Sequence, residues 1–226
     1  MTRRVALLGK PLRRRHSVVM HNAAFAAAGI DAEYLLAEID EGEVARAVAA
    51  ARGPEFLGLG VTAPYKGLVA DLVDEVEGDA RAIGAVNNVA RTEDGRLTGF
   101  NSDAPGFRAG VERALGRSIA GLDVVVAGAG GAAHAVAFAC LAGGARRVTI
   151  ANRTVSTAAA LATRLGKVGA GTTAAVALDE QALVDALRSA DLAVNATTVG
   201  MIDRGSAFRP RSHQSASTTP TNGVIQ

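Results

Sequence analysis

Residues 123–134 read Asp-Val-Val-Val-Ala-Gly-Ala-Gly-Gly-Ala-Ala-His, and this stretch decides the fold. The valines at 124–126 predict a short buried strand, and the glycine-rich turn after them opens a predicted helix. Gly128, Gly130 and Ala133 have the G-x-G-x-x-G/A spacing, which gives a tight turn, a close approach to pyrophosphate and close helix–strand packing. The stretch predicts a dinucleotide-binding unit of the Rossmann type. The alternative is that these glycines serve packing alone in an alanine-rich chain.

A second predicted strand, residues 147–151, follows at the distance expected for a βαβ unit. It runs into Asn152, Arg153 and Thr154, where an NAD-dependent enzyme usually has an acidic residue for the ribose 2′-hydroxyl. A guanidinium instead suits the 2′-phosphate of NADP, so we predict NADP as the cofactor. The alternative is a solvent-exposed arginine at a strand end. The residues of this unit expected to bind NADP are Gly128, Ala129, Gly130, Gly131, Ala132, Asn152, Arg153 and Thr154.

The first half of the chain alternates between strand-like and helix-like segments. Strands are predicted at residues 4–9, 32–39, 56–62, 84–90 and 97–101, and helices at 17–28 and 42–52. This alternation predicts an α/β fold, with a largely parallel sheet and helices on both faces. Pro105 and Gly106 precede a predicted helix at 107–115. We therefore predict a first domain at residues 1–104 and a second at 105–201.

Composition narrows the classes of function. The 226 residues carry a formal charge of +2, from 24 basic and 22 acidic residues, so no strong field of one sign is expected to attract nucleic acid. Cys140 is the one cysteine, which indicates a reducing cytoplasm and an inert buried thiol. The most apolar window, residues 124–142, contains the glycine turn and fits no membrane span. The four histidines lack the spacing of metal ligands, so no metal is predicted.

Residues 202–226 differ in character from the rest of the chain. They are rich in serine, threonine and proline, with few aliphatic residues and no periodicity. Such a segment buries too little apolar area to offset the entropy lost on ordering. We expect it to be a disordered tail, and a linker is the alternative.

Several short segments, in this order, resemble the shikimate dehydrogenase family, and the resemblance spans residues 4–201. They are Gly9-Lys-Pro11, Ser17 with His21-Asn22, Val61-Thr-Ala-Pro-Tyr-Lys66, Ala82-Ile-Gly-Ala-Val-Asn87, Gly99-Phe-Asn-Ser-Asp103, the glycine-rich turn, Asn152-Arg-Thr154 and Asn195-Ala-Thr-Thr-Val-Gly-Met201. The resemblance implies a three-layer α/β substrate domain followed by a Rossmann-like NADP domain, incomplete at the C-terminus. It further implies reversible, NADP-dependent reduction of 3-dehydroshikimate to shikimate, on the pathway to chorismate and aromatic amino acids.

The resemblance also assigns roles to residues. It makes Lys66 and Asp103 the catalytic pair at the C3 oxygen of shikimate, and an ammonium can both stabilise a developing alkoxide and supply its proton. A surface lysine and a helix-capping aspartate are the alternatives. The residues implied to bind substrate are Ser17, Thr62, Asn87 and Asp103. The residues implied to line the nicotinamide are Val199, Gly200 and Met201.

The sequence also departs from the family pattern. Arg15 stands where a first serine for the substrate carboxylate is usual, Gly60 where asparagine is common, Asn88 where threonine is common, and Thr157 where a second basic residue often assists. Quinate or another cyclic hydroxy acid is therefore an alternative substrate. Residues 202–226 show none of the family's later elements, so we expect a truncated or frameshifted product. Whether such a chain is active, is an inactive nucleotide-binding remnant or forms a homodimer is left open.

Overall fold

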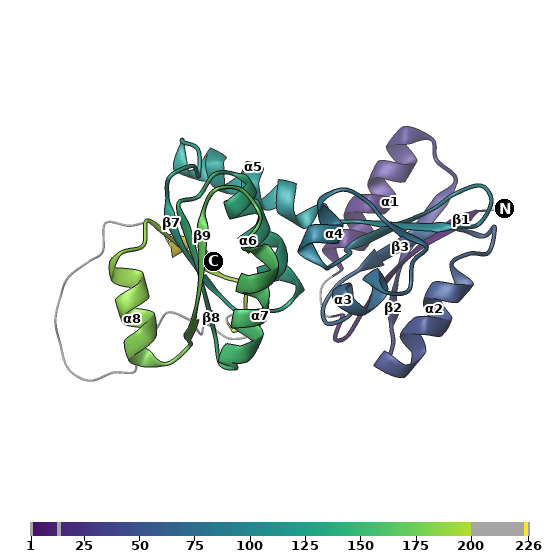
Figure 1. The fold of residues 1–226 in the computed structure, drawn as a ribbon. Coiled ribbons are helices and arrows are strands. Elements are labelled where there is room, and N and C mark those ends of the chain that lie inside the picture. Colours follow the sequence, from purple (N-terminus) through teal and green to yellow (C-terminus); the bar gives the residue numbers. More distant parts are fainter. Residues whose placement is uncertain (1, 13–14, 200–223, 226) are drawn as a thin grey trace. The chain divides into compact units, whose positions relative to one another are not determined.

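The computed structural model describes residues 2–12, 15–199 and 224–225, which form two compact α/β units, Met1–Ser102 and Asp103–Gln226 (Figure 1). Along the chain, the boundary between the units follows Ser102, two residues before the boundary predicted after residue 104. The predicted helix at 107–115 in fact begins at Asp103. Pro105 lies in its first turn, where the missing N–H costs no helical hydrogen bond, so this proline did not mark the boundary.

The first unit contains a six-stranded sheet with the order β2-β1-β3-β5-β6-β4. Its strands are β1 (Arg3–Gly9), β2 (Ala32–Glu38), β3 (Phe56–Val61), β4 (Glu75–Val76), β5 (Asn88–Arg91) and β6 (Leu97–Phe100). β1 is parallel to β2 and β3, and β4 is parallel to β6. β5 is antiparallel to both of its neighbours, β3 and β6.

The prediction of a largely parallel sheet was therefore wrong for the β5–β6 side of the first unit. β5 and β6 are joined by a short polar turn in which the Thr92 N–H donates to the Arg96 carbonyl at 2.9 Å. A connection this short joins only antiparallel strands. The strand predicted at 84–90 also began too early, because Gly84 ends a short helix with a φ of 70°.

Helices lie on both faces of the first sheet, which gives this unit three layers (Figure 1). The helical segments are α1 (His16–Ala28), η1 (Glu41–Glu43), α2 (Val44–Ala50), α3 (Lys66–Ala70) and α4 (Asp79–Ile83). One core is formed where Val44, Val48 and Val69 of α2 and α3 pack against Leu8 and Leu59 of the sheet. α1 covers the opposite face, beside the ring of Tyr34.

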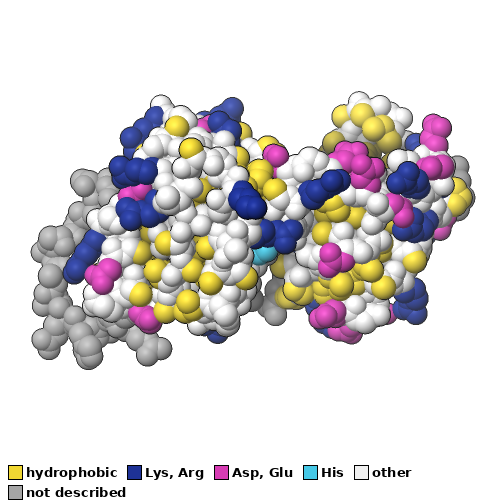
Figure 2. All heavy atoms as spheres, in the orientation of Figure 1, with side chains coloured by type: hydrophobic (Ala, Val, Ile, Leu, Met, Phe, Trp, Pro, Cys, Tyr) yellow, Lys and Arg dark blue, Asp and Glu magenta, His cyan; other side chains and the backbone are white. Residues whose placement is uncertain are grey.

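α1 is apolar yet poorly covered by the first unit. None of its residues is buried, and Val19 and Met20 are among the exposed large hydrophobic side chains. Figure 2 shows hydrophobic side chains gathered over this helix. Asn22 attaches α1 to β2, because its side-chain amide accepts from the Tyr34 N–H at 2.7 Å and donates to the Tyr34 carbonyl at 3.0 Å.

The second unit contains a parallel five-stranded sheet with the order β11-β10-β7-β8-β9. Its strands are β7 (Asp123–Ala127), β8 (Arg147–Asn152), β9 (Thr172–Ala177), β10 (Leu192–Asn195) and β11 (Val224–Ile225). Its helices are α5 (Asp103–Leu115), α6 (Gly131–Ala142), α7 (Val155–Leu165) and α8 (Glu180–Arg188). Every residue of β7 is buried, as expected for a central parallel strand with both faces covered.

Two features of the second unit bear on the sequence predictions. Cys140 is fully buried in α6, and burial raises the pKa of its thiol to about 12, so the thiol is inert as predicted. Within the segment predicted to be a disordered tail, Val224 and Ile225 instead form β11, paired in parallel with β10. A pair of β-branched residues has the local preference for such a strand. The rest of residues 202–226 lies outside the described residues.

Asp123, at the start of β7, is the centre of a charged cluster. Its side chain is only 6% exposed and accepts two bonds of 2.9 Å from the Arg146 guanidinium and one of 2.7 Å from Arg147. These arginines, with the Arg146 hydrogen bonds first, lower the pKa of Asp123 to about 2, against the opposing effect of burial. The carboxylate therefore stabilises the second unit most where it is charged.

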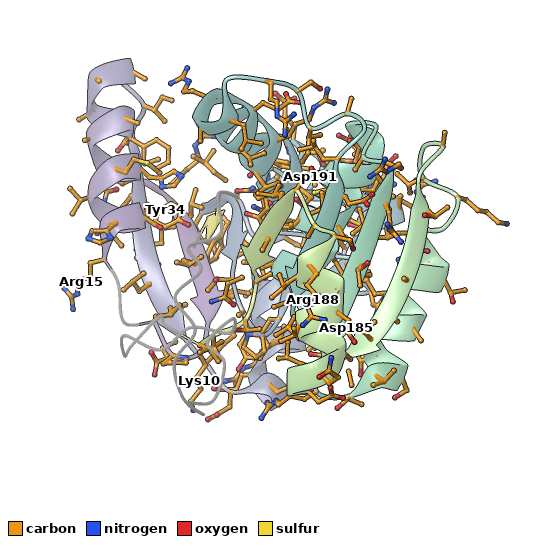
Figure 3. The ribbon with its side chains drawn as sticks, turned by 90° about the vertical axis from the view of Figure 1, so that its left-hand side faces the viewer. Lys10, Arg15, Tyr34, Asp185, Arg188 and Asp191 are labelled. Atoms are coloured by element: carbon orange, nitrogen blue, oxygen red, sulfur yellow. The ribbon has the colours of Figure 1, made fainter. Side chains whose placement is uncertain are left out.

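Asp123→Asn is expected to lower the free energy of unfolding by roughly 1–2 kcal/mol at pH 7. Because the folded pKa lies below the unfolded one, the contribution of the wild-type carboxylate is complete above about pH 4 and disappears as the pH falls toward about 2. Urea unfolding of both proteins between pH 7 and pH 3 measures this difference. The control is Asp185→Asn, since Asp185 and Arg188 form an exposed ion pair at 3.2 Å on α8 (Figure 3), which should contribute little. A difference that stays constant as the pH falls would contradict the assignment.

Candidate active site

The glycine-rich turn lies at the carboxyl end of β7. Gly128 has a φ of 111°, which disfavours any residue with a side chain, and its N–H donates to the Ala151 carbonyl of β8 at 2.8 Å. A Cβ added at Gly128 would lie 2.9 Å from the Ala196 carbonyl oxygen. The turn after β7 therefore runs directly against the segment that follows β10, and only glycine fits there.

The space around Gly130 is open, in contrast to the close contact at Gly128. It is the residue before α6, with a φ of −89°, and a Cβ added there would meet no atom of the described residues within 4 Å beyond its chain neighbours. Within the described chain no side chain caps this end of α6, and its first turn, which includes Gly131 and Ala132, has no acidic residue. The first N–H groups of a helix bind anions well, and space at Gly130 lets a phosphate approach them.

The second sheet also has a topological switch point at this place. From β7 the chain proceeds to β8 and β9 on one side, whereas β10 pairs with the other edge of β7. In open α/β sheets, ligands bind outside the carboxyl ends of the strands where the order reverses in this way. The turn at Gly128 and the segment beginning at Ala196 are the two sides of that point.

The segment after β10 is held in a compact turn by its own side chains. The Asn195 Oδ1 accepts from the Thr197 N–H at 3.0 Å and from the Thr197 hydroxyl at 2.7 Å. The Asn195 amide donates to the Val199 carbonyl at 2.9 Å, and the Val199 N–H donates to the Thr197 hydroxyl oxygen at 3.1 Å. Val199 is exposed at this edge. Gly200 and Met201, predicted to line the same site, lie outside the described residues.

The end of β8 carries the residues predicted to select the phosphate of NADP. Asn152 is the last residue of β8, and its side-chain amide donates to the Thr154 carbonyl at 3.0 Å. Thr154 directly precedes α7, so the bond fixes the turn around Arg153. Arg153 and Thr157 are exposed. The turn therefore offers one guanidinium to solvent at the strand end next to the glycine turn.

In the first unit, backbone hydrogen bonds connect the segments that carry Thr62, Lys66 and Asn87. The Val61 N–H donates to the Asn87 carbonyl at 2.9 Å, and the Val86 N–H donates to the Lys66 carbonyl at 2.9 Å. Thr62 directly follows β3 and Lys66 begins α3, and both are partly buried. Three of the predicted site residues thus come from neighbouring pieces of backbone.

A polar cluster surrounds Asn87. Its Oδ1 accepts from the Ser102 N–H at 2.9 Å and from the Asn88 side-chain amide at 2.7 Å. Its Nδ2 donates to the Ser102 hydroxyl oxygen at 3.1 Å, and Asn88 donates to the same oxygen at 2.8 Å. Asn101 is buried and donates to the Ala85 carbonyl at 2.9 Å. Asp103 follows Ser102 and belongs to the second unit, so its pairing with Lys66 stays a prediction.

Ser17 lies in the first turn of α1, near the residues that depart from the family pattern. Its carbonyl lies 2.8 Å from the His21 Nδ1, and the His21 ring stacks on Tyr34 with 4.2 Å between centroids, so His21 has a structural role. Arg15 is exposed and points outward from the start of α1 (Figure 3). A Cβ added at Gly60 would lie 2.3 Å from the Tyr34 hydroxyl oxygen. Tyr34 therefore occupies the space beside Gly60, a neighbour that the sequence analysis missed.

Among the described residues, no group of three or more His, Cys, Asp or Glu side chains is arranged to hold a metal ion. No helix in the described ranges has both the length and the apolar character needed to cross a bilayer. On the face drawn in Figure 2, basic and acidic side chains are interspersed over each unit.

The fold and the glycine turn define a class of protein: a two-unit α/β chain whose second unit is of the Rossmann, dinucleotide-binding type. Two family models match it, the shikimate dehydrogenase substrate-binding domain over residues 7–89 and the shikimate/quinate 5-dehydrogenase domain over residues 111–204. The chain belongs to the shikimate dehydrogenase family.

Its relatives are similar over most of this chain. It is 40% identical to the shikimate dehydrogenase (NADP(+)) of Moorella thermoacetica over 88% of this chain and 67% of that protein. The shikimate 5-dehydrogenase of Thermus thermophilus, solved with NADP(H) and shikimate, has a TM-score of 0.74 and 36% identity, over 90% of this chain and 72% of the other. The quinate dehydrogenase of Corynebacterium glutamicum, solved with NAD, has a TM-score of 0.79 and 33% identity, over 92% and 75%.

Proposed function

We propose that this chain is an NADP-dependent shikimate dehydrogenase that reversibly reduces 3-dehydroshikimate to shikimate. The observation that carries the proposal is the amino end of α6 at the switch point of the sheet, where none of the described side chains caps the helix or fills the space at Gly130. The names of the relatives, shikimate dehydrogenase (NADP(+)), supply the substrate and the cofactor. A cytoplasmic location is part of the proposal and is supported by the single buried thiol.

The residues of the second unit fit a bound NADP. Gly128, Ala129, Gly130, Gly131 and Ala132 would receive its pyrophosphate at the start of α6, because neither a Cβ at Gly130 nor an acidic side chain opposes it. Asn152, Arg153 and Thr154 would hold the 2′-phosphate, and Val199, Gly200 and Met201 would lie beside the nicotinamide. When bound, NADPH supplies a hydride to C3 of the substrate.

The residues of the first unit would bind the substrate and manage its proton. Thr62 and Asn87 hold substrate hydroxyl groups, and Ser17 contacts the carboxylate. Lys66 donates a proton to the C3 oxygen as negative charge develops on it, and Asp103 orients the Lys66 amine and the substrate hydroxyl. The backbone bonds between the Thr62, Lys66 and Asn87 segments support this grouping, because they keep three of these residues in one part of the first unit.

Two measurements separate this proposal from its nearest alternatives. Initial rates of oxidation are measured for shikimate and for quinate, each with NADP+ and with NAD+, and calorimetric titration measures NADPH binding. The proposal expects NADPH binding and the highest kcat/KM for shikimate with NADP+. A preference for quinate would favour the second candidate, which the similar fold of the NAD-bound Corynebacterium quinate dehydrogenase supports. NADPH binding without turnover of either acid would instead identify an inactive remnant.

Arg153→Ala is expected to raise the Kd for NADP+ by about 10–100-fold, because a charge-assisted bond to phosphate contributes roughly 1.5–3 kcal/mol. The Kd for NAD+, which lacks the 2′-phosphate, should change less than about twofold. Calorimetric titration of wild type and variant with both cofactors measures this. NAD+ serves as the internal control, and an equal loss of affinity for both cofactors would remove Arg153 from phosphate selection.

A further inference from the structure

We propose that Asn88 is a positioning residue that fixes the side chain of Asn87 and thereby determines substrate affinity. The inference rests on the proposed function, in which Asn87 binds a substrate hydroxyl group. It concerns a residue that departs from the family pattern, since threonine is common at this position.

The backbone of Asn88 is held firmly. Asn88 is the first residue of β5, which lies between two other strands, and it pairs with Gly60 of β3 on one side and with Phe100 of β6 on the other. Its side chain is partly buried. The strand pairs already fix the Asn88 backbone. The hydrogen bonds of its side-chain amide therefore restrict mainly the partner side chains.

The side-chain amide of Asn88 bonds to both partners in the cluster. An asparagine Nδ2 has two hydrogens, and here it donates to the Asn87 Oδ1 at 2.7 Å and to the Ser102 hydroxyl oxygen at 2.8 Å. The Asn87 Oδ1 also accepts from the Ser102 N–H at 2.9 Å and, at the longer distance of 3.4 Å, from the Ser102 hydroxyl. The oxygen of Asn87 is thus held within the cluster, and the side chain is restricted to one amide orientation.

Threonine at position 88 would constrain Asn87 less. A hydroxyl group has one hydrogen, so it can donate to the Asn87 Oδ1 or to the Ser102 Oγ but not to both, and any second bond would have to be accepted from the Ser102 hydroxyl. The two bonds between Asn87 and Ser102, from the Ser102 N–H and from the Asn87 Nδ2, would remain but would hold Asn87 less tightly than the full cluster does, and Ser102 directly precedes Asp103 in the chain. Asn88 therefore restricts the residue before one proposed catalytic side chain as well as a proposed substrate ligand.

The decisive experiment compares Asn88→Ala, Asn88→Thr and wild type. We expect Asn88→Ala to raise the KM for shikimate about 5–10-fold, the effect of losing hydrogen bonds of ordinary strength, and to leave the KM for NADP+ within about twofold. Asn88→Thr should recover part of that loss. Hydrogen–deuterium exchange should show faster exchange of the Ser102 amide in Asn88→Ala, because its acceptor Asn87 is no longer fixed.

Thr92→Val is the matched control. Thr92 lies in the turn at the other end of the same β5–β6 hairpin, where its hydroxyl bonds to the Arg96 carbonyl at 3.0 Å and to the Asp94 carboxylate. Loss of the Thr92 hydroxyl weakens the hairpin but leaves the contacts of Asn87 in place. We expect its KM for shikimate and its Ser102 exchange to match wild type.

The outcomes separate the two proposals. If wild type turns over shikimate but Asn88→Ala behaves like Thr92→Val in both KM and Ser102 exchange, the positioning role is overturned and the proposed function stands. If wild type does not turn over shikimate, the proposed function fails. Ser102 exchange together with calorimetric titration of shikimate then decides the positioning role alone: weaker binding and faster exchange in Asn88→Ala support it, and unchanged values overturn it.

Discussion

Lys66→Ala is expected to lower kcat for shikimate oxidation by at least about 100-fold, the usual range for loss of a general acid–base group. The proposed mechanism uses the Lys66 amine only at the reacting oxygen, so the Kd for NADPH should change less than about twofold. Steady-state kinetics with NADP+ and calorimetric titration with NADPH measure the two quantities separately.

The chain provides its own controls for this experiment, since its other lysines are Lys10 and Lys167. Lys10 pairs with Asp40 at 2.5 Å, and Lys167 is exposed in the second unit. Lys10→Ala and Lys167→Ala remove the same charge from side chains that have no role in the proposed substrate site. Both should retain kcat within about twofold. An unchanged kcat in Lys66→Ala would remove Lys66 from the mechanism.

Gly128→Ala is expected to abolish most NADPH binding, with a Kd at least about 10-fold higher, and to lower the stability of the second unit. Two causes act together. A residue with a side chain at a φ of 111° costs roughly 1–3 kcal/mol, and its Cβ would lie 2.9 Å from the Ala196 carbonyl oxygen, which must then move. Calorimetric titration measures binding, and thermal unfolding measures stability.

Alanine substitutions at two other glycines separate the effect of backbone strain from the effect on cofactor binding. Gly121→Ala places a side chain at a φ of 76° with no atom within 4 Å, so it should lower the Tm without affecting the Kd for NADPH. Gly130→Ala should leave the Tm nearly unchanged, because its backbone is ordinary and its surroundings are open, yet weaken NADPH binding. If Gly130→Ala binds NADPH as wild type does, the pyrophosphate does not approach α6 here.

The sequence predicted most of the fold where the signal was local. β7, the glycine turn and α6 follow from contiguous residues, because an apolar run and glycines at fixed spacing need no distant partner. α3 and α4 have five residues each and β4 has two, which is too short for a periodic pattern, and all three were missed. The α/β class and the shikimate dehydrogenase family were predicted correctly.

The candidate site was predictable only in part. The resemblance identified Lys66, Asn87 and Thr62, and their roles stay predictions. The hydrogen bond of Asn88 with Ser102 and the position of the Tyr34 hydroxyl beside Gly60 could not be predicted, because each brings together residues far apart in the sequence. The Asn88–Ser102 hydrogen bond depends on strand register, which is set by the pairing of β5 with β3 and β6 and does not follow from the predicted strand ranges.

The charged cluster at Asp123 lies at the amino end of β7, whereas the glycine turn lies at its carboxyl end. The amino-end edge of the second sheet thus carries ion pairs, and the carboxyl-end edge carries the backbone N–H groups at the start of α6. Low pH protonates Asp123 and weakens its ion pairs. It has no such effect at the other end of β7, because the first turn of α6 has no carboxylate to titrate. Single substitutions at one end of β7 can therefore change the stability of this unit without changing anion binding at the other end.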